Sequence, residues 1–334
     1  MKNYFAIGFI FQATLADADQ RQIIEDTVQN HILPRYEALK ETTTALSETA
    51  ELACLPESEP LRATFNEAFD DWIAVSHLRF GPSETDDRAF ALAFWPDPRG
   101  STPKTLGRLL STADEAGLNV EDFSDVSIAA RGFYAMEFLL YDDALRDVGE
   151  EGYRCSLIQT VAADIAASAI AIADDWRMDF SETLLSPSGL FKNDQEVIQE
   201  LFKALTLGFQ FTSESRIGRP LADLDRPRPR RAESWRSGRS SRNIEVSMAA
   251  MTDLAERLSA DSPDLQPRFA DSFERAQTAL ADLDDPLFRD IGDSVAWFKL
   301  KDVQTNLNQA WRLAEDELGP TLGVVAGFNA LDGD

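Results

Sequence analysis

The sequence predicts an all-α protein made of two consecutive helical bundles. Apolar residues recur every three or four positions through almost all of its 334 residues, which is the period of an amphipathic helix. Strand-like alternation of apolar and polar residues is hard to find. A connector rich in Ser, Pro and Gly at residues 181–193 interrupts the helical pattern, which then starts again. The two halves have similar helix patterns, as an ancient duplication would give.

The chain begins with features of an export signal over residues 1–18. Lys2 precedes a short apolar run at residues 4–11, and Ala16-Asp17-Ala18 has the small-x-small form of a cleavage site. The run is too short to span a bilayer, and no cysteine follows the cleavage site to carry a lipid anchor. We therefore expect a periplasmic protein with no transmembrane span in the mature chain. The alternative is a buried N-terminal segment.

Residues 19–186 form the first predicted domain. Its first helix covers about residues 20–53, as one helix or as two that meet at Pro34. Further helices are expected over 61–80, 105–117, 132–141 and 153–176. We expect His31 to be a packing or surface residue. His77 falls in the last turn of its helix, where a basic group suits the helix dipole.

Residues 187–334 form the second predicted domain. A helix over 197–209 leads into an Arg-rich loop at 216–242, followed by a helix over 244–258 and three more near 269–280, 288–298 and 303–318. Arginine forks bind carboxylates and phosphates, but we expect most of these arginines to hold the loop onto acidic helices.

Charge and cysteine content restrict the function. A net charge of −26 and a pI of about 4.4 argue against a nucleic-acid partner and against anionic membrane surfaces. Cys54 and Cys155 form either one disulfide, as in many exported proteins, or two buried thiols.

The segment at residues 131–142 is the most informative of the first half. Tyr134, Glu137 and Tyr141 are spaced to share one face of a helix that is otherwise apolar. A buried carboxylate needs a partner, which is either structural or a metal ion or ligand. The loop at residues 83–104 brings Trp95 and Asp97, which either line a site or plug the end of a bundle.

Several segments carry a family resemblance when taken in order. They are Ile32-Leu33-Pro34-Arg35-Tyr36, Leu78-Arg79-Phe80-Gly81-Pro82, Phe94-Trp95-Pro96-Asp97, residues 230–240 and the closing Gly327-Phe328 with Asp332-Gly333-Asp334. With them the chain resembles the imelysin family, exported bacterial proteins associated with iron acquisition. The family's hallmark is Gly-x-His-x-x-Glu, which Gly132, Tyr134 and Glu137 match with tyrosine in place of histidine.

The resemblance implies two helical domains with the motif near the groove between them. It implies binding of iron, haem or an iron-containing ligand, with iron-uptake components of the cell envelope as partners. A neutral phenol is a poor ligand for zinc or ferrous iron, whereas ferric iron can displace its proton and tyrosine can ligate haem. The motif is therefore either a retuned site for ferric iron or haem, or a degenerate site with no cofactor.

The predicted metal ligands are Glu137 and Tyr134. The predicted groove residues are Trp95, Asp97, Trp235, Arg236, Ser240 and Gly132. The alternative function is a non-catalytic protein-interaction module with a degenerate metal site. A metallopeptidase is less favoured, since the sequence has no His-Glu-x-x-His helix and the motif histidine is replaced.

Overall fold

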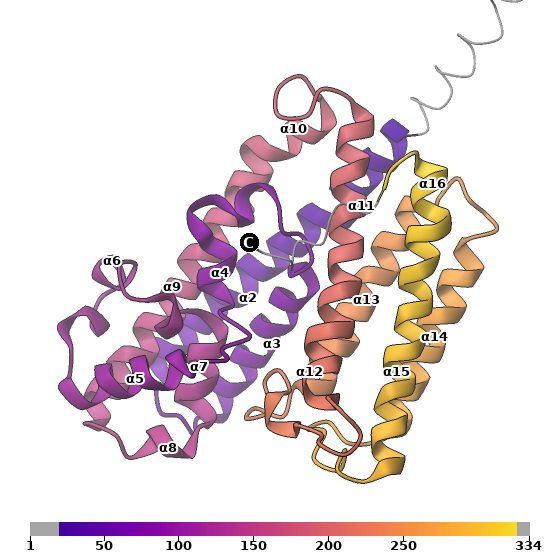
Figure 1. The fold of residues 1–334 in the computed structure, drawn as a ribbon. Coiled ribbons are helices and arrows are strands. Elements are labelled where there is room, and N and C mark those ends of the chain that lie inside the picture. The colour runs from indigo at the N-terminus through magenta and orange to yellow at the C-terminus, as the bar shows by residue number, and fades with distance from the viewer. Residues whose placement is uncertain (1–19, 326–334) are drawn as a thin grey trace, which may run out of the picture.

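The computed structural model describes residues 20–325, and these form helices and turns without a β-strand. Figure 1 shows two groups of long helices side by side, as the all-α prediction required. The predicted signal peptide at residues 1–18 lies outside the described residues, as does the segment 326–334. The predicted domain boundary after residue 186 falls in the turn between the two groups and stays a prediction.

The first group packs around three long helices. These are α2 (Leu33–Leu52), α3 (Glu59–Val75) and α9 (Glu151–Asp175), with α7 (Gly132–Tyr141) against α9. Shorter helices cover its ends: α4 (Arg88–Leu92), α5 (Ser101–Thr112), α6 (Val120–Phe123), α8 (Asp143–Arg146) and α10 (Ser181–Leu185). Leu39, Phe65 and Val161 are among the side chains that these helices bury completely.

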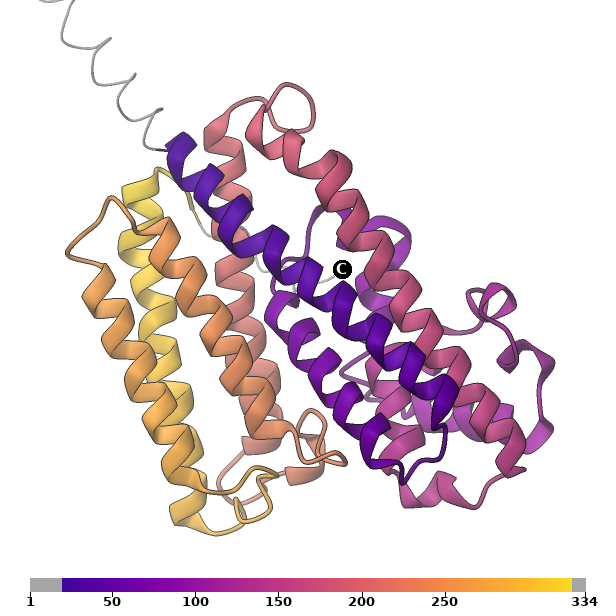
Figure 2. The ribbon, with the colours of Figure 1, turned by 180° about the vertical axis from the view of Figure 1, so that it is seen from behind.

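The second group contains four long helices. They are α11 (Asp194–Gln210), α13 (Ser240–Leu258), α14 (Gln266–Leu283) and α15 (Ser294–Leu313), with the short α12 (Gly218–Leu221) and α16 (Gly319–Leu322). Figure 2 shows α13 facing the first group, and its contact with α3 joins the two. The Arg-rich loop lies at the lower end of Figure 1, between α12 and α13.

Residues 20–52 form one continuous helix rather than two. The π-helical turn η1 (Val28–Ile32) immediately precedes Pro34, which sits in the first turn of α2. Proline has no N–H to donate, so a locally wider turn lets the helix pass it without a break. A second π-turn, η6 (Trp176–Phe180), extends α9 into α10, so the connector begins at residue 186 rather than at 181.

The prediction of separate helices at 288–298 and 303–318 was wrong. Residues 284–293 form an irregular turn, in which Phe288 has a positive φ of 54°. Asp293 then caps α15 by accepting hydrogen bonds from the backbone N–H groups of Val295 and Ala296. Phe288 and Ile291 are buried although they lie in a turn. They are three positions apart, so the sequence pattern resembled that of a helix.

Cys54 and Cys155 form a disulfide, which settles the alternative left open by the sequence. The bond ties the end of α2 to α9 across 101 residues of chain. Within residues 20–325, the stretch Glu151–Leu185 is long and apolar enough to cross a membrane, but 56% of its most apolar window is buried inside the protein.

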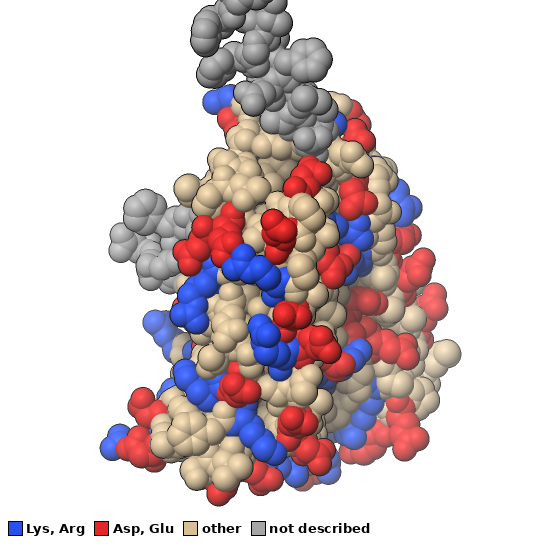
Figure 3. Space-filling model, turned by 90° about the vertical axis from the view of Figure 1, so that its right-hand side faces the viewer, with Lys and Arg blue, Asp and Glu red and all other residues tan. Residues whose placement is uncertain are grey.

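The acidic character of the chain is visible on its surface. Figure 3 shows one face on which acidic side chains are spread widely, with basic ones between them. One ion pair of the second group joins Arg268 of α14 to Glu317 of η9 (Ala314–Leu318). Such mixed surfaces suit solubility rather than binding to a polyanion.

Candidate ligand-binding groove

The motif helix α7 begins at Gly132 with a close backbone approach. Gly132 has a φ of +75°, and a Cβ atom there would lie 2.2 Å from the carbonyl oxygen of Leu92. Only glycine combines this φ with so close a neighbour. Just before it, Arg131 forms an ion pair with Asp164 of α9 at 2.6 Å. These contacts fix the position from which Tyr134 and Glu137 project.

Tyr134 is buried and already has a protein partner. Its hydroxyl donates a hydrogen bond to Glu233 of the Arg-rich loop. The other oxygen of Glu233 accepts hydrogen bonds from Arg216 Nε at 2.8 Å and Asn243 Nδ2 at 2.9 Å. Burial raises the pKa of Tyr134 well above 10, and the negative charge of Glu233 raises it further. The phenol therefore keeps its proton and donates a hydrogen bond to Glu233.

Glu137 is satisfied by a different residue. Its Oε1 atom accepts hydrogen bonds from the backbone N–H and the hydroxyl of Ser237, at 2.9 and 2.7 Å. Burial raises the pKa of Glu137, while these two bonds and the charge of Arg236 lower it without cancelling that rise. The carboxyl group thus finds its partner in the Arg-rich loop.

A bare metal ion does not fit the motif in this arrangement. The Tyr134 hydroxyl points at Glu233, and one oxygen of Glu137 is held by Ser237. Between residues 20 and 325, no group of three or more His, Cys, Asp or Glu side chains could surround an ion. Ferric iron bound by Tyr134 would have to displace the phenol's hydrogen bond to Glu233 and its proton.

Most of the predicted groove residues meet around one hollow of about 520 Å³. Those that line it are Trp95, Asp97, Tyr134, Glu137, Trp235 and Arg236. Gly132 and Ser240 do not line it. Gly132 packs on the backbone of α4, and the Ser240 hydroxyl donates a hydrogen bond to the Glu233 carbonyl at 2.7 Å, behind the wall.

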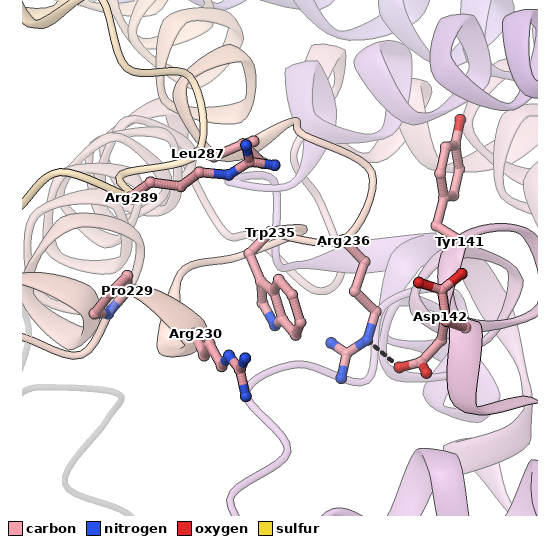
Figure 4. Close-up of a pocket in the computed structure, with 9 residues that line it drawn as sticks. Tyr141, Asp142, Pro229, Arg230, Trp235, Arg236, Leu287 and Arg289 are labelled. Carbon is pink, nitrogen blue, oxygen red and sulfur yellow. Dashed lines mark hydrogen bonds and ion pairs between the residues drawn. The ribbon is translucent and has the colours of Figure 1, made fainter.

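A second hollow of about 480 Å³ adjoins the first, and Figure 4 shows its lining. Arg230, Trp235 and Arg236 line both hollows. Arg236 is held by an ion pair with Asp142 and lies over the Phe138 ring at 3.8 Å. We call the two hollows together the arginine groove.

Several arginines of the groove have no acidic partner. Within the described part of the chain, Arg219, Arg230, Arg231 and Arg289 make no ion pair and donate no side-chain hydrogen bond to another residue. Burial lowers the pKa of Arg219, and the positive charge of Arg231 lowers it further. In a chain of net charge −26, this concave surface therefore gathers arginines without an acidic partner, although Asp97 and Glu137 also line it.

Trp95 and Asp97 are positioned by the loop before α5. The Trp95–Pro96 peptide is cis, and the Trp95 ring stacks on Tyr134 with 6.1 Å between ring centroids. Burial tends to raise the pKa of Asp97, but hydrogen bonds from backbone N–H groups, including that of Thr102 at 2.8 Å, lower it overall. The Asp97 carboxylate therefore accepts hydrogen bonds from the first turn of α5.

Glu233 and the contact between the two histidines were not predicted from the sequence. His31 and His77 are both buried, and their Nε2 atoms are 2.9 Å apart. His31 Nδ1 lies 2.7 Å from Asp253 of α13. We expected His31 to be a packing or surface residue and His77 to interact with a helix dipole. Neither expectation included the contact between the two rings or the contact with Asp253.

The described residues form an all-α protein of two packed helical groups, with a charged groove beside the buried motif helix α7. The sequence model of the family described as imelysin matches residues 32–313, and the chain belongs to that family. No curated protein sequence matches it.

Solved structures share the fold, among them the following two. An imelysin-like protein from Psychrobacter arcticum has 17% sequence identity and a TM-score of 0.79, with 93% of this chain and 98% of that chain covered. A protein described as a putative iron-regulated protein A precursor, from Parabacteroides distasonis, has 14% identity and a TM-score of 0.74, with 89% and 94% covered. At these identities the likeness is one of fold.

Proposed function

We propose that the chain binds an anionic, iron-loaded small molecule in the arginine groove, in iron uptake or sensing. The observation that carries the proposal is the set of unpaired guanidinium groups of Arg219, Arg230, Arg231 and Arg289 among the described residues. Guanidinium groups bind carboxylates and phosphates through two parallel hydrogen bonds. An iron complex with carboxylate arms, such as haem with its propionates or ferric citrate, supplies matching groups.

The shape and lining of the groove support a small molecule rather than an ion. Each hollow has a volume in the range of small-ligand sites, about 300–1,000 Å³. Phe94, Trp95 and Trp235 offer aromatic surface beside the arginines. Glu137 lies in the lining next to Arg236, where its second oxygen can accept a donor from the ligand. Under this proposal Tyr134 shapes the wall and does not ligate iron.

The association with iron rests on the family and on the description of one structural relative. The Parabacteroides relative in fold is described as iron-regulated and as a precursor. With the signal-like residues 1–18, this supports export to the periplasm and partners among the iron-uptake components of the cell envelope.

The test is a titration of the purified protein with ferric citrate and with haemin, followed by calorimetry and visible absorption. Iron-free citrate serves as the ligand control. We expect Arg219→Gln with Arg231→Gln to weaken binding of the iron complex by about tenfold or more, because each loses a charge-assisted hydrogen bond. Arg268→Gln removes the same charge from α14 at a position that lines neither hollow, and this variant should bind as the natural chain does.

Two results would overturn the proposal. One is unchanged affinity in the double variant, and the other is a natural chain that takes up neither iron complex. The second result would favour the alternative, a non-catalytic interaction module whose groove receives an acidic segment of a partner. Metallopeptidase activity has less support, because the motif histidine is Tyr134 and the two histidines contact each other.

A further inference from the structure

A separate cavity of about 410 Å³ lies between the end of α3 and the helix α11. Its walls are largely aromatic and apolar, with Trp72, Phe90, Trp95, Leu207 and Phe211 among them. Trp95 and Tyr134 separate it from the arginine groove, because both residues line both spaces. His77, which is only 4% exposed, also lines this cavity.

A chain of hydrogen bonds fixes which nitrogen of each histidine carries its proton. Asp253 is ion-paired with Arg35 at 3.0 Å and with Arg257 at 2.8 Å, so it is a carboxylate and only accepts hydrogen bonds. His31 Nδ1, at 2.7 Å from it, must therefore be the donor. In a neutral ring this leaves His31 Nε2 without a proton, as an acceptor.

The second step follows from the contact between the rings. His31 Nε2 can accept only if His77 Nε2, at 2.9 Å, donates. His77 Nδ1 then carries a lone pair and no proton. Burial lowers the pKa of His31 to about 4 and that of His77 well below 6.5, so both rings are neutral at pH 7.

His77 Nδ1 has no partner among the described residues. The one side-chain hydrogen bond that the described residues give His77 is made through Nε2, and the residue lines the cavity. An acceptor held in one tautomer at the wall of an apolar cavity is the arrangement that orients a ligand through a single polar contact.

We propose that this cavity binds a small flat aromatic molecule bearing an O–H or N–H donor, with His77 Nδ1 as the acceptor. The aromatic walls take the ring, and the Asp253–His31–His77 chain holds the acceptor in place. The site is independent of the proposed iron function, since none of the unpaired groove arginines lines it. The basic side chains that line it, Arg79, Lys203 and Arg216, each pair with a glutamate of the described residues, so the cavity suits an acid such as citrate less well than the arginine groove does.

The test uses a matched pair of probes, 2-naphthol and 2-methoxynaphthalene, which differ in the donor hydrogen. We expect 2-naphthol to bind about tenfold more tightly, the difference that one hydrogen bond makes. The chain has only two histidines, so long-range ¹H–¹⁵N spectra can follow each ring nitrogen. In the free protein the His77 proton should lie on Nε2. Binding of 2-naphthol should shift the His77 Nδ1 signal, and binding of 2-methoxynaphthalene should not.

Equal affinity for the two probes, a His77 proton on Nδ1, or an unmoved Nδ1 signal with bound 2-naphthol would each overturn the proposal. His77→Leu should abolish the difference between the probes while retaining apolar binding. If that variant does not fold, the comparison of probes on the natural chain still decides. Arg289→Gln should leave 2-naphthol binding unchanged, because Arg289 lines the arginine groove and not this cavity, and this separates the two sites.

Discussion

The buried carboxylate of Glu233 should contribute strongly to stability, and Glu233→Gln tests this. The carboxylate is 1% exposed and accepts hydrogen bonds from Tyr134, Arg216 and Asn243. Its ion-pair partner Arg216 is 3% exposed, so glutamine would leave a positive charge buried without its counter-charge. Breaking one side of a buried ion pair costs about 3–5 kcal/mol of the free energy of unfolding.

Arg216 keeps weaker contacts in this variant, and these reduce the expected loss of unfolding free energy. Its guanidinium also donates to the hydroxyls of Thr212, Ser247 and Ser76 at 3.1–3.2 Å. We therefore expect about 3 kcal/mol rather than 5, measured as the shift in urea denaturation followed by circular dichroism. The matched control is Glu317→Gln, which breaks an exposed ion pair with Arg268 and should leave the denaturation midpoint unchanged.

A loss of less than about 1 kcal/mol for Glu233→Gln would refute this reasoning, because that is the size of one neutral hydrogen bond. The double change Glu233→Leu with Arg216→Met gives a further check. It removes both charges and keeps an apolar interior, so it should be less destabilising than Glu233→Gln alone. The reverse order would show that the contacts of the pair, rather than the unpaired charge, hold the loop.

Three further predictions concern other parts of the fold. Reduction of the Cys54–Cys155 bond should lower the free energy of unfolding by about 4–5 kcal/mol, as expected for a closed loop of 101 residues, and a Cys54→Ser variant should not respond to dithiothreitol. Gly132→Ala should cost more than about 2 kcal/mol in the same denaturation assay, because it combines a φ of +75° with a clash against the backbone of α4; a near-normal midpoint would contradict so close an approach of the two backbones. The pKa of His31 is lowered from 6.5 to about 4, so the unfolded chain binds the proton first as the pH falls, and stability present above pH 6.5 should decrease by about 2 kcal/mol between pH 7 and pH 5. His77 shifts in the same direction and adds to the loss, and a flat profile in urea titrations at the two pH values would argue against the buried neutral pair.

The sequence predicted the fold class because helical periodicity is local. Most of the long helices fall where apolar stripes indicated them, including the buried motif helix Gly132–Tyr141. The failure near Phe288 has a local cause as well. A turn that folds back onto the core buries Phe288 and Ile291 at a helix-like spacing, and periodicity does not distinguish this from a helix.

The site was only partly predictable, since its residues come from distant segments. Trp95, Glu137 and Trp235 were singled out by type and by resemblance, and the structure brings them to one hollow. Glu233 lies 99 residues from Tyr134, and no local pattern marks it as the partner of a phenol. The contact between His31 and His77, 46 residues apart in the chain, was hidden for the same reason.

The arginines of the loop divide into two sets, and this division bears directly on function. Arg216, Arg236 and Arg239 reach Glu233, Asp142 and Asp70, and Arg242 also reaches Asp70, so these four hold the loop onto the helices. They are fewer than the majority of the nine loop arginines that we expected to do so. Arg219, Arg230 and Arg231 have the same chemistry but lack such partners among residues 20–325, although the chain is rich in acids. Arginines without an acidic partner do not help to attach the loop to the helices, and like charges close together repel one another. The unpaired set is the reason for proposing a bound anion, and the paired set holds the loop that carries it in position.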